Sequence, residues 1–217
     1  MRKPEAGTMP DGPVMEEAGI EIIGAGGHAK VVVATLLERG VPVARAYSRE
    51  PHGAGAALLA VPISHGEPSR VERGVIAVGD NRARQMLAQR VTAGRWETVV
   101  HPRAYVHASA TLGAGVVVFA GAVVQPDAVI GDHVILNTGA TIDHDCRVEA
   151  FAHVAPGAHL AGGVTVGEGA LVGIGSAVAP GRSIGAWARV GAGAAVLRDV
   201  AAGTTVVGVP ARARSLH

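Results

Sequence analysis

The second half of the chain carries an aliphatic residue at every sixth position. The sixteen members of this column are Val106, Leu112, Val118, Val124, Ile130, Leu136, Ile142, Val148, Val154, Leu160, Val166, Val172, Val178, Ile184, Val190 and Val196. A period of six fits neither the 3.6-residue turn of a helix nor the alternation of an amphipathic strand. Short repeats of fixed period are typical of solenoids, whose stacked units share one continuous core. With three units closing each triangular coil, the pattern predicts about five coils of short strands.

A second column, four residues after the first, holds small residues or valine. It includes Ala110, Val116, Ala122, Ala128, Val134, Ala140, Cys146 and Ala152, and Arg182 is its one clear misfit. We expect the aliphatic side chains to point inward and the small ones to lie where the chain turns. Glycines at these turns supply backbone freedom. They occur as the pairs Gly113/Gly115, Gly162/Gly163, Gly167/Gly169, Gly173/Gly175 and Gly191/Gly193. This pattern resembles the left-handed parallel β-helix of hexapeptide-repeat transferases.

The first half has the pattern of a small α/β domain. A β-rich run at 19–23 ends in the glycine-rich turn Gly24–His28, and a helix is expected over Ala29–Arg39 with Gly40 as its stop. Further expected elements are a strand over Val41–Tyr47, a loop over Ser48–Ala57, a buried strand over Val75–Val78, a helix over Arg82–Thr92 capped by Asn81, and a strand over Thr98–Val100. The sequence therefore predicts a flexible tail at 1–18, an α/β domain at 19–98, a β-helix at 99–205 and a C-terminal tail at 206–217.

Composition and charge argue against several classes of protein. Hydrophobic residues make up 48% of the chain but aromatic residues only 3%, which suits a slender solenoid better than a thick globular core. No apolar run approaches the roughly 18 residues of a membrane helix, and the polar start has no signal-peptide core, so we expect no membrane partner. The net charge of +1 without a basic run argues against nucleic acid. The single cysteine fits a reducing cytoplasm.

The glycine-rich turn matches a dinucleotide fingerprint only loosely, as Gly24-x-Gly26-x-x-Ala29. The expected ribose-binding acid would lie about 20 residues further on, near Ser48, Arg49 and Glu50. A glycine-rich turn that opens a helix presents backbone N–H groups to an anion. The turn therefore favours a mononucleotide or sugar-nucleotide phosphate over a redox cofactor, and purely structural glycines are the alternative.

The sequence Asp143-His144-Asp145 falls at a predicted corner of the solenoid. A carboxylate beside an imidazole raises its basicity, and imidazole exchanges protons near neutral pH. His144 is therefore a candidate general base with either aspartate as its partner, and a solvated surface histidine is the alternative.

Metal binding and cysteine chemistry were the remaining possibilities for this region. A zinc site would need several imidazoles, and the candidates are His133, His144, His153 and His159. Zinc-binding prism proteins of the γ-carbonic anhydrase type carry a His-x4-His pair, which this chain lacks, so we expect no metal. Cys146 lies in the small-residue column, where a packed thiol is favoured over a nucleophile.

Together these motifs resemble the family of sialic acid O-acetyltransferases and UDP-4-amino-sugar N-acetyltransferases, which includes the bacillosamine-pathway enzyme. The resemblance spans nearly the whole chain after residue 19. It is carried by the stretches Ile23–His28, Ala77–Asn81, Leu136–Cys146, Phe151–Val154 and Val207–Ala211.

The resemblance implies a role for individual residues. His144 would be the general base and Asp145, where the amino-sugar enzyme has glutamate, the residue that raises its basicity. The implied acetyl-CoA contacts are His153, Gly162, Ile174 and Ala192, and the implied nucleotide-sugar contacts are Gly26, Gly27, His28 and Gly79. The family's aspartate pair after the second strand is replaced by Ser48 and Arg49, and Arg49 would suit a phosphate or a carboxylate instead.

We therefore expect an acetyl-CoA-dependent N-acetyltransferase that acts on a nucleotide-linked amino sugar. The alternatives are O-acetylation of a sialic acid and, from another class, a zinc-dependent hydratase. A convex prism offers no cleft for a molecule as long as acetyl-CoA, whereas three prisms packed about an axis create a groove at each junction. The expected assembly is a homotrimer with its active sites between subunits.

Overall fold

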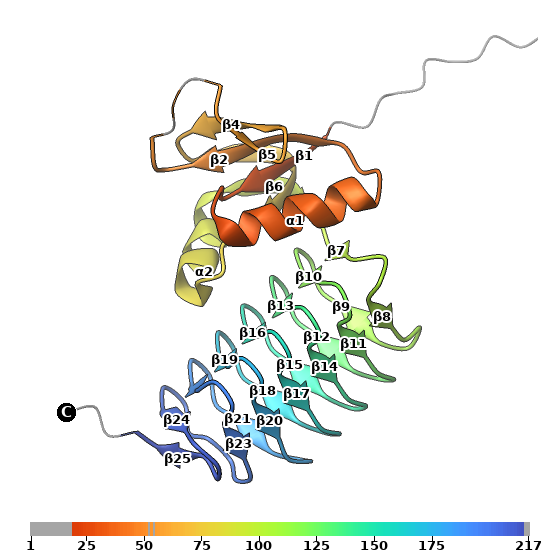
Figure 1. The fold of residues 1–217 in the computed structure, drawn as a ribbon, viewed down its shortest axis with the longest axis vertical. Coiled ribbons are helices and arrows are strands. Elements are labelled where there is room, and N and C mark those ends of the chain that lie inside the picture. Colours follow the sequence, from red (N-terminus) through yellow and green to blue (C-terminus); the bar gives the residue numbers. More distant parts are fainter. Residues whose placement is uncertain (1–18, 52, 54, 215–217) are drawn as a thin grey trace, which may run out of the picture.

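The computed structural model describes residues 19–51, 53 and 55–214, and it divides into an α/β domain stacked on one end of a solenoid (Figure 1). The tail expected at 1–18 lies outside the described residues. The α/β domain contains β1 (Ile20–Ile23), α1 (Gly27–Glu38), β2 (Val43–Ser48), β3 (Ala57–Leu58), β4 (Val61–His65), β5 (Arg70–Ile76), α2 (Asn81–Arg90) and β6 (Thr92–Trp96).

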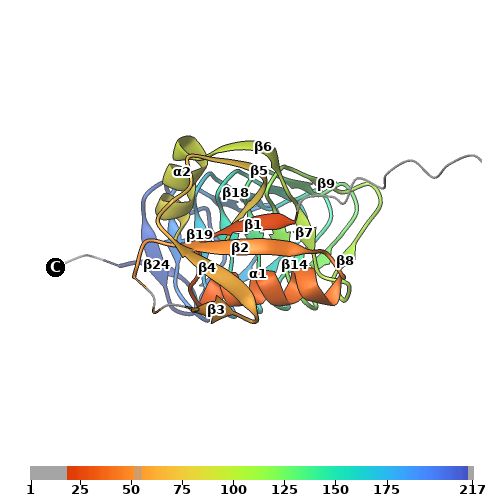
Figure 2. The same ribbon diagram turned by 90° about the horizontal axis from the view of Figure 1, so that it is seen from above.

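The strands of the α/β domain form one sheet in the order β3-β4-β2-β1-β5-β6, parallel except for the β3–β4 pair. Apolar residues of α1, such as Val32 and Leu36, pack between this sheet and the first coils, where they meet Val117 and Ile135 of the solenoid. Figure 2 shows the sheet seen from above, with α1 and α2 along opposite sides of it. The two parts therefore share a hydrophobic core.

The sequence prediction for this domain missed three strands and placed one helix cap wrongly. Strands β3, β4 and β6 were not expected: Pro62 interrupts the pattern of β4, and β6 is a largely exposed edge strand. Asp80, not Asn81, caps α2, because its Oδ1 accepts a hydrogen bond of 2.8 Å from the backbone N–H of Ala83. The Asn81 amide is used elsewhere, since it donates to solenoid carbonyls.

The solenoid confirms the period of six. Its strands are β7 (Val99–Val100), β8 (Tyr105–Val106), β9 (Thr111–Leu112), β10 (Val117–Val118), β11 (Val123–Val124), β12 (Val129–Ile130), β13 (Ile135–Leu136), β14 (Thr141–Ile142), β15 (Arg147–Val148), β16 (His153–Val154), β17 (His159–Leu160), β18 (Thr165–Val166), β19 (Leu171–Val172), β20 (Ala177–Val178), β21 (Ser183–Ile184), β22 (Arg189–Val190), β23 (Ala195–Val196), β24 (Thr205–Val207) and β25 (Arg212–Ala213). Each residue of the aliphatic column is the second residue of a strand from β8 to β23.

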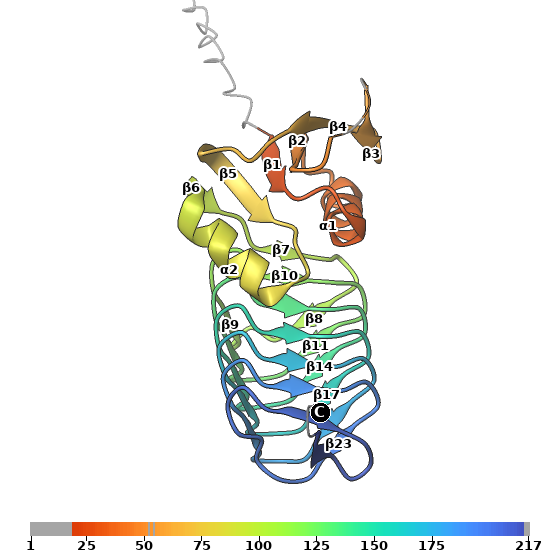
Figure 3. The same ribbon diagram turned by 90° about the vertical axis from the view of Figure 1, so that its left-hand side faces the viewer.

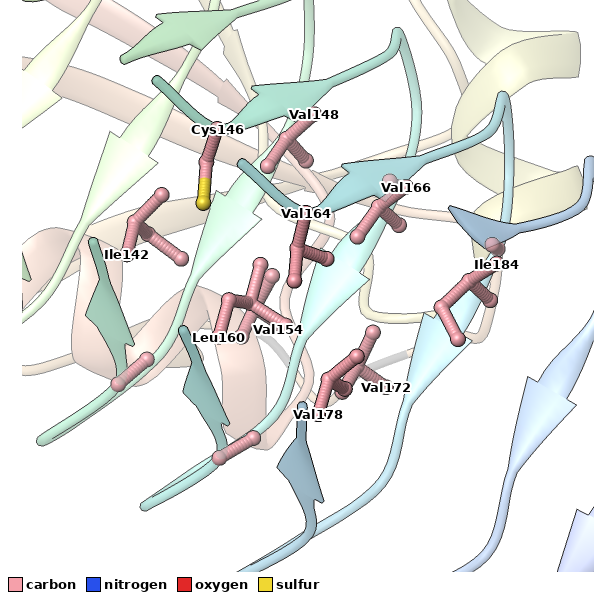
Figure 4. Close-up of a cluster of buried hydrophobic side chains, with 14 of the residues drawn as sticks. Ile142, Cys146, Val148, Val154, Leu160, Val164, Val166, Val172, Val178 and Ile184 are labelled. Atoms are coloured by element: carbon pink, nitrogen blue, oxygen red, sulfur yellow. The ribbon is translucent and has the colours of Figure 1, made fainter. Parts of the chain in front are cut away.

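The strands stack into three sheets, one on each side of the prism (Figure 3). The first sheet runs β7-β10-β13-β16-β19-β22-β24-β25, the second β8-β11-β14-β17-β20-β23, and the third β9-β12-β15-β18-β21. Strands stack in parallel with an 18-residue step, so that Val118 lies beside Leu136 and Leu136 beside Val154. Both predicted columns line the buried core from Val116 to Val206 (Figure 4).

The C-terminal stretch from residue 206 is not a tail as far as it is described. Val206 lies beside Val190 in the first sheet, and β25 turns back to pair antiparallel with β24. Val206 is buried, so the last aliphatic side chain closes the open end of the core. The prediction missed this strand because the six-residue spacing breaks after Val196.

Every sixth residue from 115 to 193 has a positive φ, which places it at a corner of the prism. Most of these corner residues are glycines, for which that conformation costs little. Five are not: Asp127, His133, Asp145, Phe151 and Trp187, with φ between 54° and 61°. A side chain in this region is strained, so each of these positions has a reason to retain one.

Three of the five lie under helix α2, at one corner of successive coils. His133, Phe151, Gly169 and Trp187 follow one another at the 18-residue step, and α2 contacts all four coils. The rings of His133 and Phe151 stack with centroids 5.3 Å apart, and Trp96 packs edge-on against His133. The guanidinium of Arg82 lies 4.1 Å from the Trp187 ring centroid. These aromatic corners form the surface of the solenoid on which the α/β domain packs.

Arg84 of α2 joins the two parts through a buried guanidinium, which the sequence prediction did not identify. It is 1% exposed. It donates to the carbonyl oxygens of His133 (2.8 Å), Phe151 (2.6 Å), Ala152 (3.3 Å), Val78 (3.1 Å) and Gly79 (3.3 Å), and to Oδ1 of Asn81 (2.9 Å). Burial lowers the pKa of Arg84 to about 10, which still leaves it charged at neutral pH.

Candidate active site

His144 lies at the corner between β14 of the second sheet and β15 of the third. Its Nδ1 is 2.7 Å from Oδ2 of Asp145, whereas Asp143 accepts a hydrogen bond of 2.8 Å from the backbone N–H of His144. The two aspartates therefore differ in function: Asp145 contacts the ring and Asp143 contacts the backbone. The positive φ of Asp145 is what turns its carboxylate back onto the preceding side chain.

Electrostatics at this corner favour the protonated imidazole. The hydrogen bond to Asp145 raises the pKa of His144 most, and the charge of Asp143 adds to it. The imidazole is 61% exposed, and its other edge lies over Gly162 of the next coil. A Cβ at Gly162 would stand 2.6 Å from Nε2 of His144. The structure thus places Gly162 beneath the candidate base, apart from the other predicted acetyl-CoA contacts.

Cys146 lies next to this corner but faces the core. It is fully buried, its thiol lies 3.2 Å from the carbonyl oxygen of Ala161, and burial raises its pKa. A buried thiol with a raised pKa is a poor nucleophile, which agrees with the packed thiol expected from the sequence.

A groove of about 740 Å³ runs down the outer face of the first sheet, below the α/β domain. Four predicted residues line it together: Gly79, His153, Ile174 and Ala192. Ile174 and Ala192 occupy the same corner of successive coils, and His153 belongs to β16. The sequence prediction missed the groove's charged and aromatic residues, Arg82, Trp187, Arg189 and Arg214.

The groove and His144 lie on opposite sides of one prism. The groove covers the first sheet, and the corner that carries His144 joins the second sheet to the third. In a three-sided prism, that corner is the one opposite the first sheet. A single chain therefore brings His144, Asp145 and Gly162 together in one place and the other predicted acetyl-CoA contacts together in another.

Two further histidines, His153 in the groove and His28 next to it, are held neutral. Nε2 of His153 lies 3.0 Å from Nδ2 of Asn137, and burial, with Arg84 and His28 nearby, lowers the pKa of His153 to about 3. His28 packs edge-on against Phe119, 6.4 Å from the His153 ring, and burial lowers its pKa to about 4. Their low pKa values make both rings weaker bases than His144, but both can form directed hydrogen bonds.

A second cavity, of about 340 Å³, lies in the α/β domain at the carboxyl ends of β1, β2 and β4. It brings together the predicted residues Gly26, Ser48 and Arg49 and also includes Glu50 and Glu67. Arg49 forms an ion pair with Glu67. The sequence offered no signal for Glu67, because the contact joins two loops 18 residues apart.

The predicted residues Gly27 and His28 do not line this second cavity but begin α1 beside it. Gly26 is the N-cap of α1, without a capping side chain or an acidic residue in the first turn. The backbone N–H groups of this turn can therefore receive an anion.

The described part of the chain contains no group of three or more His, Cys, Asp or Glu side chains arranged to hold a metal ion. Among residues 19–51, 53 and 55–214, no helix is long and apolar enough to cross a membrane.

An α/β domain with a nucleotide-sized cavity, stacked on a hexapeptide solenoid with an aspartate-paired histidine, defines an acyltransferase of the hexapeptide class. Comparison with protein-family models agrees: residues 19–91 match the PglD N-terminal domain, and residues 109–144 match the bacterial transferase hexapeptide (six repeats). A comparison with curated proteins gives no match.

Solved structures extend the likeness over most of the chain. Perosamine N-acetyltransferase from Caulobacter crescentus, in complex with CoA and GDP-perosamine, is 40% identical, with a TM-score of 0.85 over 92% of this chain and 98% of that one. The acetyltransferase domain of PglB from Neisseria gonorrhoeae, in complex with acetyl coenzyme A, is 34% identical, with a TM-score of 0.83 over 90% and 98%. WeeI from Acinetobacter baumannii, at 22% identity and a TM-score of 0.62, shares the fold. The chain belongs to the N-acetyltransferase family of hexapeptide-repeat acyltransferases and is an acetyltransferase.

Proposed function

We propose that this enzyme transfers the acetyl group of acetyl-CoA to the amino group of a nucleotide-linked amino sugar, with His144 as the general base. The observation that carries the mechanism is the contact between Nδ1 of His144 and Asp145. The likeness to enzymes solved with CoA, acetyl-CoA and GDP-perosamine supports both substrates.

The contact with Asp145 determines which imidazole atom takes the proton. Since Nδ1 donates to the carboxylate, the neutral ring has its free lone pair on Nε2. The sugar amine attacks the thioester carbonyl carbon and loses a proton to Nε2 as the C–N bond forms. When the C–S bond breaks, CoA leaves as thiolate and takes a proton from the imidazolium, which restores the neutral base. Asp145 stabilises the transient imidazolium, so the step needs no covalent enzyme intermediate.

We assign acetyl-CoA to the groove on the first sheet. His153 and Ile174 would face the acyl and pantetheine part, and Arg189 and Arg214 further down would face the phosphates. His153 lies two strands above Arg189 in the first sheet, a separation of about 10 Å at the spacing of neighbouring strands.

We assign the nucleotide sugar to the α/β domain. The diphosphate would lie at the uncapped start of α1, at Gly26, Gly27 and His28, because backbone N–H groups and the helix dipole favour an anion there. The sugar would then extend past Gly79 toward His153, since Gly79 lies beside His28 and lines the groove.

We propose a homotrimer with sites shared between subunits. In one chain His144 lies on the corner opposite the groove, so it can reach only an acetyl-CoA that is bound to another copy. A cyclic arrangement of three prisms brings the corner of each copy to the groove of the next.

The test is CoA release measured with a panel of nucleotide-linked amino sugars and, separately, with sialic acids. We expect release only with the amino sugars. Arg49 was the residue that could have suited the carboxylated acceptor of the O-acetylation alternative, and here Arg49 is paired with Glu67. Release with sialic acid alone would transfer the assignment to O-acetylation, and release with neither class would reject the proposed function.

A further inference from the structure

We propose that the cavity lined by Arg49 and Glu67 is a guanine site, in which this ion pair recognises the base of a GDP-linked substrate. The inference rests on the proposed function only in taking a nucleotide-linked sugar as the acceptor. The base specificity is argued from the cavity itself.

The cavity lies where a parallel sheet presents a nucleotide site. The chain runs outward from β1 through β2 to β4 and then returns to the other side of β1 as β5. In open α/β sheets ligands bind outside the carboxyl ends of the strands at such a reversal. The cavity is lined together by Ile23 and Gly24 at the end of β1, Tyr47 and Ser48 at the end of β2, and Val78 after β5. The uncapped start of α1 lies at one side of the cavity. A diphosphate bound there would not fill the cavity, which would remain open to the base.

The parallel pairing of two strands brings Arg49 and Glu67 close together. Strands β2 and β4 are parallel neighbours in which Ser48 pairs with His65, and the N–H of Gly66 donates to the Ser48 carbonyl over 2.7 Å. Arg49 directly follows Ser48 and Glu67 follows His65 by two residues, so the two side chains leave adjacent strand ends within one residue of each other. Nε of Arg49 donates to Oε2 of Glu67 over 2.7 Å, and Nη2 donates to the same oxygen.

This pairing leaves a set of groups that matches one base. A guanidinium has five N–H groups, of which Glu67 takes two, and a carboxylate has two oxygens, of which Arg49 contacts one. The pair therefore offers a donor beside two acceptor positions. The Watson–Crick edge of guanine has the complementary order: the O6 acceptor, then the N1–H donor, then the N2–H donor. Side by side, Arg49 and Glu67 present the same order of groups as cytosine.

The other bases do not fit this order. Uracil presents an acceptor, a donor and an acceptor, so one of its carbonyls would face the Glu67 carboxylate. Cytosine and adenine begin with an amino donor, which would face the Arg49 guanidinium. Such apposed like groups leave each other without hydrogen bonds, and the cost grows as the bound base displaces water from the pair. Glu50 also lines the cavity, so the lining carries two carboxylates and one guanidinium, a balance that favours a hydrogen-bond-donating base over a phosphate.

The test is equilibrium binding of GDP, IDP and UDP to the full-length protein by calorimetry, without acetyl-CoA. IDP lacks only the 2-amino group of guanine. We expect the order GDP, then IDP, then UDP, with GDP at least about 10-fold tighter than UDP, the discrimination typical of a bidentate contact to a base. Equal affinities, or a preference for UDP, would overturn the guanine assignment.

Variants test whether the Arg49–Glu67 ion pair is what recognises the base. Glu67→Gln should weaken GDP by about 10-fold, leave UDP nearly unchanged and reduce the ratio of GDP to IDP affinity toward one. Glu50→Gln is the matched control, a carboxylate of the same cavity that is not the ion-pair partner of Arg49, and it should keep the wild-type ratio. Arg49→Ala should weaken GDP and IDP alike, because both carry O6. If Glu50→Gln removes the preference while Glu67→Gln keeps it, the assignment to the Arg49–Glu67 pair is wrong.

Folding and function are controlled separately. A Glu67→Gln protein that still binds acetyl-CoA with wild-type affinity has an intact solenoid, so its loss of GDP is local. If the wild-type protein binds GDP with the expected preference but releases no CoA from a GDP-linked amino sugar, the proposed function falls and the guanine site stands. If it acetylates a UDP-linked sugar better than its GDP-linked counterpart, the guanine site falls and the proposed function stands.

Discussion

The Nδ1 atom of His144 lies 2.7 Å from Oδ2 of Asp145, the next residue in the chain. Adjacent side chains rarely meet this way in extended backbone, where they point to opposite faces. The left-handed φ of 61° at Asp145 makes the contact possible. Backbone strain at one corner therefore orients the imidazole and sets which of its nitrogens is open to the acceptor.

The first prediction is that His144→Ala lowers kcat by about 10²- to 10⁴-fold, the range for loss of a general base. Acetyl-CoA binding should stay near wild type, because the groove lies on the opposite side of the same chain. Steady-state kinetics and calorimetric titration with CoA measure the two effects. A variant with more than about a tenth of the wild-type rate would remove His144 from this role.

The second prediction concerns the pH–rate profile of Asp145→Asn. His144 acts as a base when it is neutral, so the rate falls as the pH drops through its pKa. Asp145 raises that pKa, so removing its charge should lower the pKa and move the acid limb to lower pH. Asp143→Asn is the matched comparison and should shift the limb less, because Asp143 bonds the backbone N–H. A larger shift from Asp143→Asn would reverse the two roles.

The third prediction is complementation between two inactive variants. His144→Ala removes the base, and Ala192→Trp blocks the groove at an exposed corner. If one site takes these residues from different subunits, unfolding and refolding the mixture should form trimers in which some sites have both walls native, and activity should return. Each variant refolded alone is the control. A monomer by light scattering would contradict the trimer, and a trimer without recovery would place both residues in one subunit's site.

The fourth prediction is that Arg84→Met lowers the free energy of unfolding by about 3 kcal/mol or more. The buried guanidinium bonds five carbonyl oxygens and Asn81, and its removal leaves buried acceptors unpaired at about 1–3 kcal/mol each. Arg82→Met is the control, two residues earlier in the same helix. It removes the contact of Arg82 with the Trp187 ring and should lower the free energy of unfolding by less than about 1 kcal/mol. Urea unfolding of both variants measures the difference, and equal losses would mean that Arg84 is not the main link.

The fifth prediction is that stability falls as the pH drops from about 6.5 toward 4. Burial lowers the pKa of His28 and His133 to about 4 and that of His153 to about 3. In this window the unfolded chain takes up protons that the folded chain does not, so acid favours unfolding, by up to about 1.4 kcal/mol per pH unit for each group.

His133→Phe tests the fifth prediction directly. It removes one titrating ring and keeps an aromatic side chain against Phe151 and Trp96, so the melting temperature should fall less steeply between pH 7 and pH 5. His65→Gln, a change at an exposed strand residue, is the control and should follow wild type. An unchanged slope for His133→Phe would assign the acid sensitivity to other groups.

The solenoid was predictable from the sequence because its core is built from local repetition. Each aliphatic residue of the column enters the core in the same way as the one six places earlier, so one rule predicts every strand from β8 to β23. The pairing of His144 with Asp145 was within reach for the same reason, since the two residues are neighbours. The structure was needed only to decide which aspartate contacts the imidazole ring: Asp145 does, and Asp143 contacts the backbone N–H instead.

What could not be predicted depends on contacts between distant segments. Arg84 bonds carbonyl oxygens 49 and 67 residues away, at His133 and Phe151, and nothing in its local sequence marks it as buried. Glu67 lies in a loop without a motif, and only its contact with Arg49 in the folded chain marks it as a candidate site residue. The cap of α2 was misassigned because Asp80 and Asn81 are equally good caps by type, and the solenoid carbonyls that occupy Asn81 come from residues 169 and 170.

Helix α2 touches the same corner in four consecutive coils, at His133, Phe151, Gly169 and Trp187. The offset between the nucleotide cavity and the groove can therefore change only in steps of one whole coil. Removing 18 residues between His133 and Trp187 would slide the groove by one strand spacing, about 4.8 Å, relative to the cavity. An added coil beyond Val196 would lengthen the groove and leave that offset untouched. Redesign for a longer acyl carrier should therefore begin at the C-terminal end of the stack.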